Sequence, residues 1–209
     1  RGMPRRVVIG TAGWAIPRPS AHHVPGEGSH LQRYARRFGG VEINSSFYRP
    51  HAPATYARWA RATPPAFRFA VKVPQQITHE CALRGTRRLL AAFLSECAGL
   101  GRKRGPLLVQ LPPSFAFEPR VARRFFAELR TLYGGAVVCE PRHPTWFGAG
   151  AEALLAAHRV ARVAADPPPA PGDERAAEHE QEVADHAADE RGAHDLVQAA
   201  ADREQGDDE

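Results

Sequence analysis

The stretch "FRFAVKVPQQITHECALRGTRRLLAAFLSECAGLGRKRGPLLVQLPP" (67–113) combines strand-like and helix-like segments. Two short apolar runs, 67–74 and 105–113, flank a segment with helical spacing at 85–101, which closes on a glycine. Apolar strands joined through a helix are typical of parallel strands that are buried on both faces. The stretch therefore predicts one strand–helix–strand unit of a parallel sheet covered by helices.

The same unit recurs along the chain. We expect strands at 7–14, 41–48, 67–74, 105–113, 136–144 and 160–169. We expect helices between them at 31–38, 53–63, 85–101, 119–135 and 150–159. Six strands in this order fit either a doubly wound open sheet or a (β/α)₈ barrel.

Three features favour the barrel. The turn "GTAGW" (10–14) is not the Gly-rich phosphate loop of a dinucleotide-binding sheet. The strands alternate polar with apolar residues, and polar residues gather at their C-terminal ends, where barrel enzymes keep their chemistry. A complete barrel typically needs about 250 residues. The fold class predicted is thus an α/β, TIM-type (β/α)₈ barrel, truncated to about six units within residues 3–171.

The net charge of +5 over 209 residues is the sum of a basic and an acidic part of the chain. Residues 1–171 carry a balance of +16, which could attract nucleic acid or phosphorylated ligands, or could simply reflect an Arg-rich surface. Residues 172–209 carry −11 and no aromatic residue, which predicts a disordered or loosely helical acidic tail. We hypothesise that a frameshift near Pro171 produced this tail, and translation of the other two reading frames tests it.

Composition also bears on the compartment. The chain contains no run of about 18 apolar residues, so we expect no membrane span. It has no apolar segment near its start, so we expect no secretory signal. The three cysteines, Cys81, Cys97 and Cys139, have no C-x-x-C spacing and fit a reducing environment. We expect a cytoplasmic protein.

Strand periodicity predicts a polar site at the mouth of the barrel. Residues two apart on a strand share a face, so polar side chains at the strand ends would line one lumen. This set is Glu42, Asn44, Lys72, Gln110, Glu140, Arg142 and Asp166. Buried ions must pair, so the set could be a structural ion-pair network; a ligand or catalytic site is the favoured interpretation.

Candidate roles follow from residue type. The predicted catalytic residues are Glu42, Lys72, Glu140, Arg142 and Asp166. The predicted ligand-binding residues are Trp14, Asn44, Tyr48, Arg49, Gln110, His143 and Trp146. These candidate residues are compatible with three kinds of function, and each function would use a different subset of them.

The first is metal-assisted chemistry, in which Glu42, Glu140, His143 and Asp166 would surround a divalent ion. The second is metal-free acid–base chemistry by Glu42 and Glu140, as on glycosides. The third is binding of nucleic acid or another anion without catalysis, with Trp14, Tyr48 and Trp146 available for stacking.

Five segments occur in an order and spacing that resemble a known family. They are "IGTAGW", "VEINSSFYR", "FRFAVKVPQQITH", "GPLLVQLPPSF" and "EPRHPTWF". They resemble the YecE-like family, domain of unknown function 72, over residues 7 to about 171. The resemblance implies a fold similar to TIM barrels, and it implies no reaction, because the activity of the family is not established.

The chain departs from the family pattern in two places. The resemblance implies a seventh strand with an Arg-Leu-His-Gly-like motif and an eighth with paired asparagines, and neither motif occurs here. The loop at 15–30 also differs from the usual aromatic-rich version. A barrel without two strands would expose two strand edges, so we expect poor solubility or association, and loss of activity in this chain.

The resulting expectation is a YecE-like protein with an enzyme-type barrel site for a small anionic or sugar-like substrate. The alternative is a protein that binds nucleic acid or an anionic ligand without catalysis. A divalent metal is a possible cofactor, no membrane partner is expected, and the oligomeric state is left open.

Overall fold

The computed structural model describes residues 7–165. The predictions for Asp166, for the acidic tail at 172–209 and for a frameshift concern residues outside this range and stay predictions.

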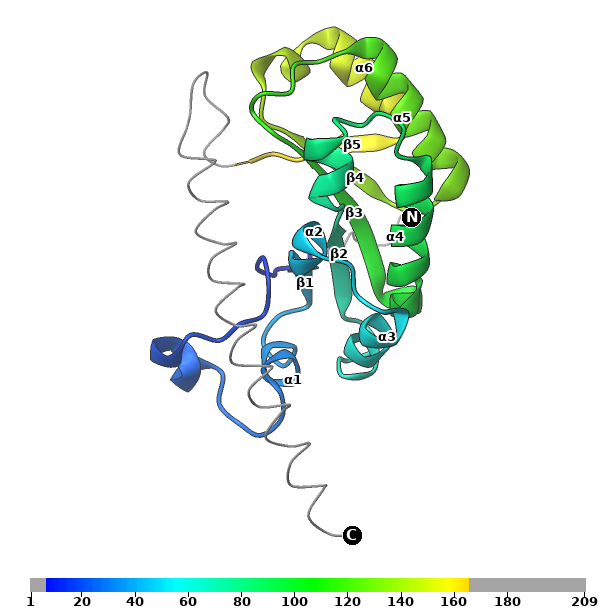
Figure 1. Ribbon diagram of the computed structural model, residues 1–209. Coiled ribbons are helices and arrows are strands. Elements are labelled where there is room, and N and C mark those ends of the chain that lie inside the picture. Colours follow the sequence, from blue (N-terminus) through cyan, green and yellow to red (C-terminus); the bar gives the residue numbers. More distant parts are fainter. Residues whose placement is uncertain (1–6, 166–209) are drawn as a thin grey trace, which may run out of the picture. The chain divides into compact units, whose positions relative to one another are not determined.

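A five-stranded parallel sheet forms the centre of the described residues (Figure 1). Its strands lie in chain order and are β1 (Gly40–Ile43), β2 (Arg68–Lys72), β3 (Arg104–Leu111), β4 (Val137–Pro141) and β5 (Val160–Arg162). Every neighbouring pair is parallel. The predicted α/β class and parallel sheet are therefore confirmed.

Helices connect the strands. The α-helices are α1 (His30–Tyr34), α2 (Ser45–Tyr48), α3 (Pro53–Arg61), α4 (Arg87–Cys97), α5 (Pro119–Leu132) and α6 (Ala149–Ala157). Three 3₁₀ helices, η1 (Arg18–His23), η3 (Ala98–Lys103) and η4 (Pro144–Phe147), and one π-helix, η2 (Gln76–Glu80), complete the connections. No helix in residues 7–165 is long and apolar enough to cross a membrane.

One face of the sheet packs against α3 to α6 and forms the hydrophobic core (Figure 1). The longest helix, α5, has Pro119 at its start, where the missing N–H is not needed. Its buried residues Ala122, Phe125, Phe126 and Leu129 recur at helical spacing and meet the sheet. This amphipathic pattern fixes which face of the helix turns inward.

The first predicted strand, 7–14, is wrong in extent. Only Ala12 bridges to β1, opposite Glu42, with the Glu42 N–H donating to the Thr11 carbonyl at 3.0 Å. Gly13 then adopts a positive φ of 83°, which turns the chain away from the strand direction. The segment thus follows the edge of β1 without extending its ladder.

The second predicted strand, 41–48, is also wrong in its latter half. Pairing with β2 ends at Ile43, and Ser45–Tyr48 form the short helix α2. The buried hydroxyl of Ser46 lies 2.8 Å from the Ile43 carbonyl and 2.7 Å from the Lys72 carbonyl. These contacts fold α2 over the ends of β1 and β2, so Asn44 and Ser46 do not continue the strand face of Glu42.

Candidate functional site

The sheet face opposite the helices carries the polar side chains. In β2, Phe69 and Val71 are in the core, and Ala70 and Lys72 point to the other face. Glu42 on β1, Gln110 on β3 and Glu140 on β4 occupy the same face, and Arg142 follows the end of β4. We call these residues the polar cluster: Glu42, Lys72, Gln110, Glu140 and Arg142.

Glu42 is a partly buried carboxylate in this cluster. It lies opposite Ala70 in the ladder, two residues before Lys72 on the neighbouring strand. Burial raises the pKa of the Glu42 carboxyl; the positive charge of Lys72 opposes this effect, and the negative charge of Glu140 adds to it. Glu42 therefore keeps its proton to a higher pH than an exposed glutamate does.

Lys72 ends β2 and is only 5% exposed. Its Nζ lies 4.2 Å from the centroid of the Phe47 ring, a cation–π distance. Phe47 belongs to α2, which is fixed over the strand end by the bond from Ser46 to the Lys72 carbonyl. The ammonium is therefore held between an aromatic face and a carboxylate-bearing sheet.

Glu140 and Arg142 form an ion pair, with Nη2 and Oε1 2.5 Å apart. Their side chains are 12% and 24% exposed, so solvent screens this pair less than it would screen a surface pair. Gln110 is the ladder partner of Glu140 on β3. The predicted grouping of Gln110, Glu140 and Arg142 is present, although β4 ends at Pro141 rather than at residue 144.

Two buried atoms of the cluster make no hydrogen bond within the part of the chain that the structure describes. They are Oε1 of Gln110, an acceptor, and Nε of Arg142, a donor. Buried polar groups are normally satisfied, and a bound ligand or water is one way to satisfy them. The cluster thus offers both kinds of polar contact.

His79 joins this region although it was not among the predicted site residues. Its ring packs edge-on against Phe47, with centroids 5.0 Å apart, and its Nδ1 lies 2.8 Å from the Thr78 hydroxyl. Burial, helped by the charge of Lys72, lowers the pKa of His79 to about 4, so the imidazole is neutral at pH 7. Its buried Nε2 has no hydrogen-bond partner among the described residues.

The π-helix η2 places His79 there. Helices of this kind are rare and frequently occur at functional sites. The segment "QITHE" that forms it has no local pattern that distinguishes a π-helix from a loop. The available signal was its position, directly after a strand that ends in a lysine.

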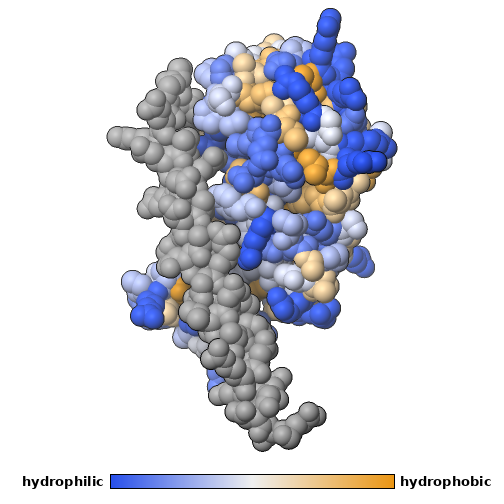
Figure 2. Space-filling model, viewed as in Figure 1, coloured by the Kyte–Doolittle hydropathy of each residue, from blue (hydrophilic) through white to orange (hydrophobic). Residues whose placement is uncertain are grey.

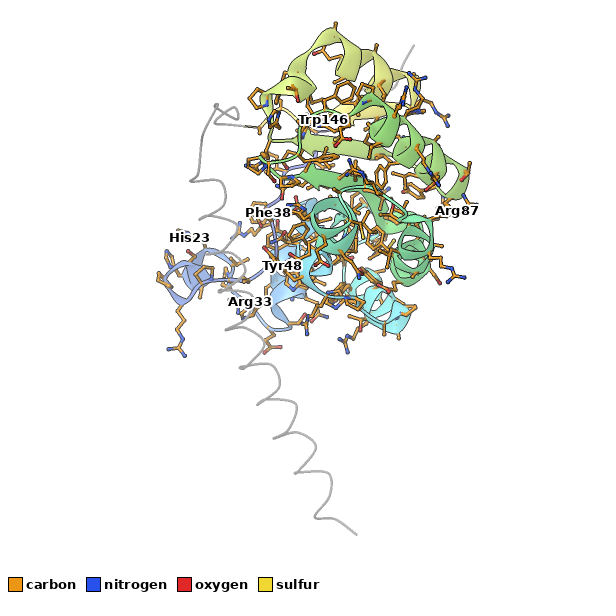
Figure 3. All side chains as sticks on the ribbon, turned by 45° about the horizontal axis from the view of Figure 1, so that its top comes forward. His23, Arg33, Phe38, Tyr48, Arg87 and Trp146 are labelled. Carbon is orange, nitrogen blue, oxygen red and sulfur yellow. The ribbon has the colours of Figure 1, made fainter. Side chains whose placement is uncertain are left out.

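The predicted stacking residues do not come together. Trp14 packs edge-on against Trp59, with ring centroids 5.0 Å apart, and Tyr48 packs edge-on against Phe47 at 4.9 Å. Trp146 is fully buried, and its indole N–H donates to the Phe115 carbonyl at 2.9 Å. Figure 3 shows Tyr48 and Trp146 well apart. Trp146 has no exposed ring face and serves the core.

Three further predicted ligand-binding residues lie outside the polar cluster. Asn44 is half-buried just before α2, and Arg49 is exposed just after it. His143 caps η4, where its Nδ1 accepts from the Thr145 N–H at 3.2 Å. His143 therefore has a local structural role, as its position before Pro144 allows.

The candidate metal ligands form no cluster within residues 7–165. No three His, Cys, Asp or Glu side chains in this range lie close enough together to hold a metal ion. Asp166, the remaining predicted ligand, is not among the described residues. We therefore assign no reaction step to a metal.

The cluster combines groups suited to proton transfer and anion binding. Glu42 is an acid with a raised pKa, Lys72 is a buried ammonium, and Glu140 is a carboxylate fixed by a guanidinium. Two carboxyls in different environments are a common basis for separate acid and base roles.

Comparisons with known proteins agree with this fold. Residues 8–201 match the model of the family "Protein of unknown function DUF72". This match extends past residue 171, where the resemblance in sequence motifs ends. The chain is 33% identical over 147 residues to the UPF0759 protein YecE of Escherichia coli K12. That match covers 70% of this chain and 52% of the relative, so the chain spans about half the length of the curated relatives it matches.

Two solved structures are similar. A DUF72 family protein from Thermotoga maritima MSB8 aligns with a TM-score of 0.61 at 25% identity, covering 74% of this chain and 63% of that one. A DUF72 family protein from Enterococcus faecalis V583 gives a TM-score of 0.61 at 21% identity, covering 73% and 58%. The family match, the identity to YecE and these folds agree with the motif resemblance: the chain belongs to the DUF72 family.

Proposed function

We propose that the polar cluster carries out metal-free acid–base chemistry on a small anionic or sugar-like substrate. The observation that supports this most is the placement of the half-buried Glu42 and the buried Lys72 on one face of neighbouring strands, where burial raises the pKa of the Glu42 carboxyl. A carboxyl that titrates nearer to neutral pH is a better general acid or base than an exposed one.

Each residue has a role in this proposal. Glu42 exchanges a proton with the substrate, and the Lys72 ammonium binds a substrate oxygen that carries negative charge. Glu140, fixed by Arg142, orients a hydroxyl or a water molecule. Gln110 Oε1 and His79 Nε2 supply further hydrogen-bonding contacts at the same end of the sheet.

We also propose that the sheet is part of an eight-unit (β/α) barrel whose lumen contains the polar cluster. Glu42 and Glu140 lie on strands separated by β2 and β3, a spacing of about 14 Å along a flat sheet. A curved sheet with this face inside would bring the two carboxyls closer together, and it would place the polar strand ends in the lumen, as in enzymes of this fold.

A ligand screen on the full chain tests the proposal. The probes are monosaccharides, sugar phosphates and nitrophenyl glycosides, with binding followed by saturation-transfer NMR and turnover by absorbance. For a compound that is bound and converted, Glu42→Gln should lower kcat about 10²- to 10⁴-fold, as expected for loss of a general acid–base. Lys72→Met should weaken binding of the phosphates about tenfold or more.

Glu152→Gln is the matched control, because it removes an exposed carboxylate of α6 that pairs with Arg162 of β5 and does not belong to the polar cluster. It should change neither rate nor affinity. Turnover that survives Glu42→Gln, or phosphate binding that survives Lys72→Met, would contradict the assigned roles.

A second candidate function is polyanion binding without catalysis. Exposed arginines recur on the outer helices, with Arg87 and Arg88 on α4 and Arg120, Arg123 and Arg124 on α5. Figure 2 shows hydrophilic side chains interspersed with small hydrophobic patches on the face in view. A single-stranded oligonucleotide titration discriminates: polyanion binding predicts affinity that falls steeply with salt, and Lys72→Met should leave it unchanged.

A further inference from the structure

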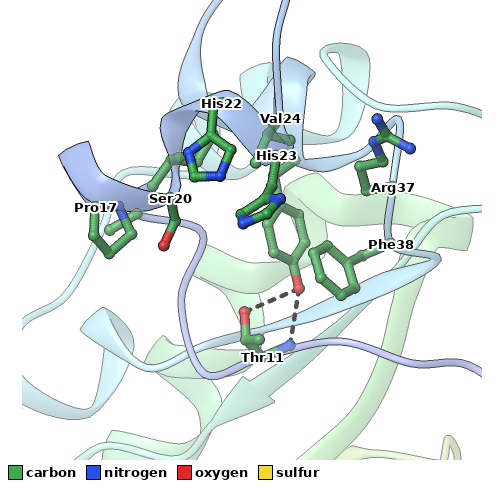
Figure 4. Close-up of a pocket in the computed structure, with 11 residues that line it drawn as sticks. Thr11, Pro17, Ser20, His22, His23, Val24, Arg37 and Phe38 are labelled. Carbon is green, nitrogen blue, oxygen red and sulfur yellow. Dashed lines mark hydrogen bonds between the residues drawn. The ribbon is translucent and has the colours of Figure 1, made fainter.

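A cavity lies between the N-terminal segment, η1 and α1 (Figure 4). Its volume is about 600 Å³, within the range of small-molecule sites. Its walls are largely apolar, with Ile16, Val24 and Phe38 among the lining residues. It shares no lining residue with the polar cluster, so it would be a separate site.

The loop that follows η1 is held by arginines of α1 and of the turn directly after it. Arg33 donates from Nε and Nη2 to the Val24 carbonyl at 2.8 and 2.6 Å, and Arg36 donates to the Glu27 carbonyl at 3.0 Å. Ser29 and Gln32 form a capping box that starts α1. These contacts hold η1 opposite α1 and keep the cavity walls in place.

The floor of the cavity satisfies its own polar groups. The Tyr34 hydroxyl accepts from the Thr11 N–H at 2.8 Å and lies 3.1 Å from the Gly40 carbonyl. It also lies 3.0 Å from the Thr11 hydroxyl, which donates to the Gly13 carbonyl at 2.7 Å. The floor is therefore a closed hydrogen-bond network with little left to offer a ligand.

The rim of the cavity differs from the floor, because the polar side chains of the rim are exposed and have no hydrogen-bond partner within the described range. Ser20, His22, His23 and Arg37 line the cavity, and their side chains make no hydrogen bond to any residue in the range 7–165. The two imidazoles lie close together, with centroids 3.7 Å apart and their planes tilted by 44° (Figure 4). The rim carries a guanidinium and no carboxylate, which suits an anion.

We propose that this cavity binds a small amphipathic carboxylate. Its apolar body would lie against Ile16, Val24 and Phe38, and its carboxylate would reach Arg37 and the imidazoles at the rim. A sugar or a free phosphate fits less well, because apolar walls would leave many of its polar groups without partners. The loop that supplies the histidines lies in the 15–30 segment, where the chain departs from the family pattern.

Calorimetric titration of the full chain with octanoate, and with octan-1-ol as the uncharged match, tests this. Octanoate should bind, and octan-1-ol should bind about 5-fold or more weakly, since it lacks the charge that Arg37 recognises. Arg37→Gln should remove that difference. Arg18→Gln, on η1 but not in the cavity lining, should preserve it.

Amide NMR shifts locate the binding independently of the variants. Octanoate should shift the amides of Thr11, Val24 and Phe38 and leave those of Lys72 and Glu140 in place. No binding at millimolar octanoate, equal affinity for the alcohol, insensitivity to Arg37→Gln, or shifts centred on the polar cluster would each overturn the proposal.

Discussion

Lys72 and Lys103 are the two lysines among the 28 basic residues of the chain, and both turn inward. The Lys103 ammonium donates to the Ala60 and Thr63 carbonyls, both at 2.5 Å, at the end of α3. Lys72 lies against Phe47 in the polar cluster. A compact ammonium fits both places, whereas the planar guanidinium used elsewhere is larger and needs a different geometry.

Lys72→Arg should therefore not be a conservative change. The larger head group would displace Phe47 or Glu42, so we expect a loss of about 1–3 kcal/mol in the free energy of unfolding. Urea unfolding followed by circular dichroism measures this. Arg120→Lys on the exposed side of α5 should be close to neutral, and an equally small effect at Lys72 would show that the ammonium position is not constrained.

Buried histidines should make the protein sensitive to acid. The pKa values of His79 and His51 are each lowered to about 4, first by burial and then by Lys72 and Arg49 respectively. Unfolded histidine takes up its proton near pH 6.5, so between about pH 6.5 and 4 the unfolded chain binds more protons. The free energy of unfolding should fall as the pH is lowered through this window.

His79→Gln should reduce that fall by about 1–2 kcal/mol, discounted for the partial exposure of the ring. Unfolding curves at pH 7 and pH 4.5 give the comparison, with His22→Gln at an exposed position as the control. The charged group facing His79 is Lys72, so the same pair of measurements on Lys72→Met should show a smaller slope. An unchanged slope in His79→Gln would mean that its imidazole protonates normally in the folded state.

Among the elements, η3 packs unusually closely on α3. A Cβ at Gly99 would meet the Pro53 carbonyl and would lie 2.9 Å from the Ala57 nitrogen. Gly99→Ala should therefore force the two helices apart, at a cost of about 1–3 kcal/mol in the free energy of unfolding, which urea unfolding measures. Gly134→Ala is the matched control, since a Cβ at that position would meet no other part of the described chain within 4 Å; a neutral Gly99→Ala would show that η3 can move freely.

Strands and helices were predictable from the sequence where the spacing of apolar residues within the element itself determines which face is buried. The alternation in "FRFAVK" correctly separates core residues Phe69 and Val71 from Lys72, and the spacing in 119–135 correctly predicts α5. The helix α2 was not predictable, because "NSSFY" continues a strand-like pattern and the Ser46 hydroxyl binds the distant Lys72 carbonyl as well as the nearby Ile43 carbonyl. The π-helix with His79 was missed for the same reason: its place depends on Phe47 and Lys72.

At the scale of the whole molecule, the edge beside β1 is apolar. Val7, Val8 and Ile9 are 82%, 48% and 68% exposed, and they are the large hydrophobic residues left exposed within the described range. Unprotected edges of this kind favour association between chains. The sequence predicts poor solubility or association, and the exposed segment 7–9 is the place where we expect chains to associate.

We expect the wild-type chain to show a weight-average mass above the monomer value in light scattering, increasing with concentration. The double variant Val7→Lys, Ile9→Lys should shift it toward the monomer, since edge lysines oppose pairing. Arg120→Lys should have no effect. A monomeric wild type at all concentrations would contradict this expectation.

The motifs in the sequence were sufficient to predict the family and the α/β class, which the comparisons support. The polar cluster was predicted for Glu42, Lys72, Gln110, Glu140 and Arg142, because strand alternation alone places them on one face. The roles of Trp146 and His143 were not predictable, since each depends on a loop conformation: Trp146 reaches the Phe115 carbonyl, and His143 caps η4.

An NMR titration of the Glu42 side-chain carboxyl in the full chain shows whether the polar cluster is one electrostatically coupled site. Its pKa should lie above the usual glutamate value, should fall when Glu140→Gln removes a like charge, and should rise when Lys72→Met removes an opposite one. A Glu42 carboxyl that titrates as an exposed glutamate, with a pKa that neither substitution changes, would mean that the cluster residues are not coupled.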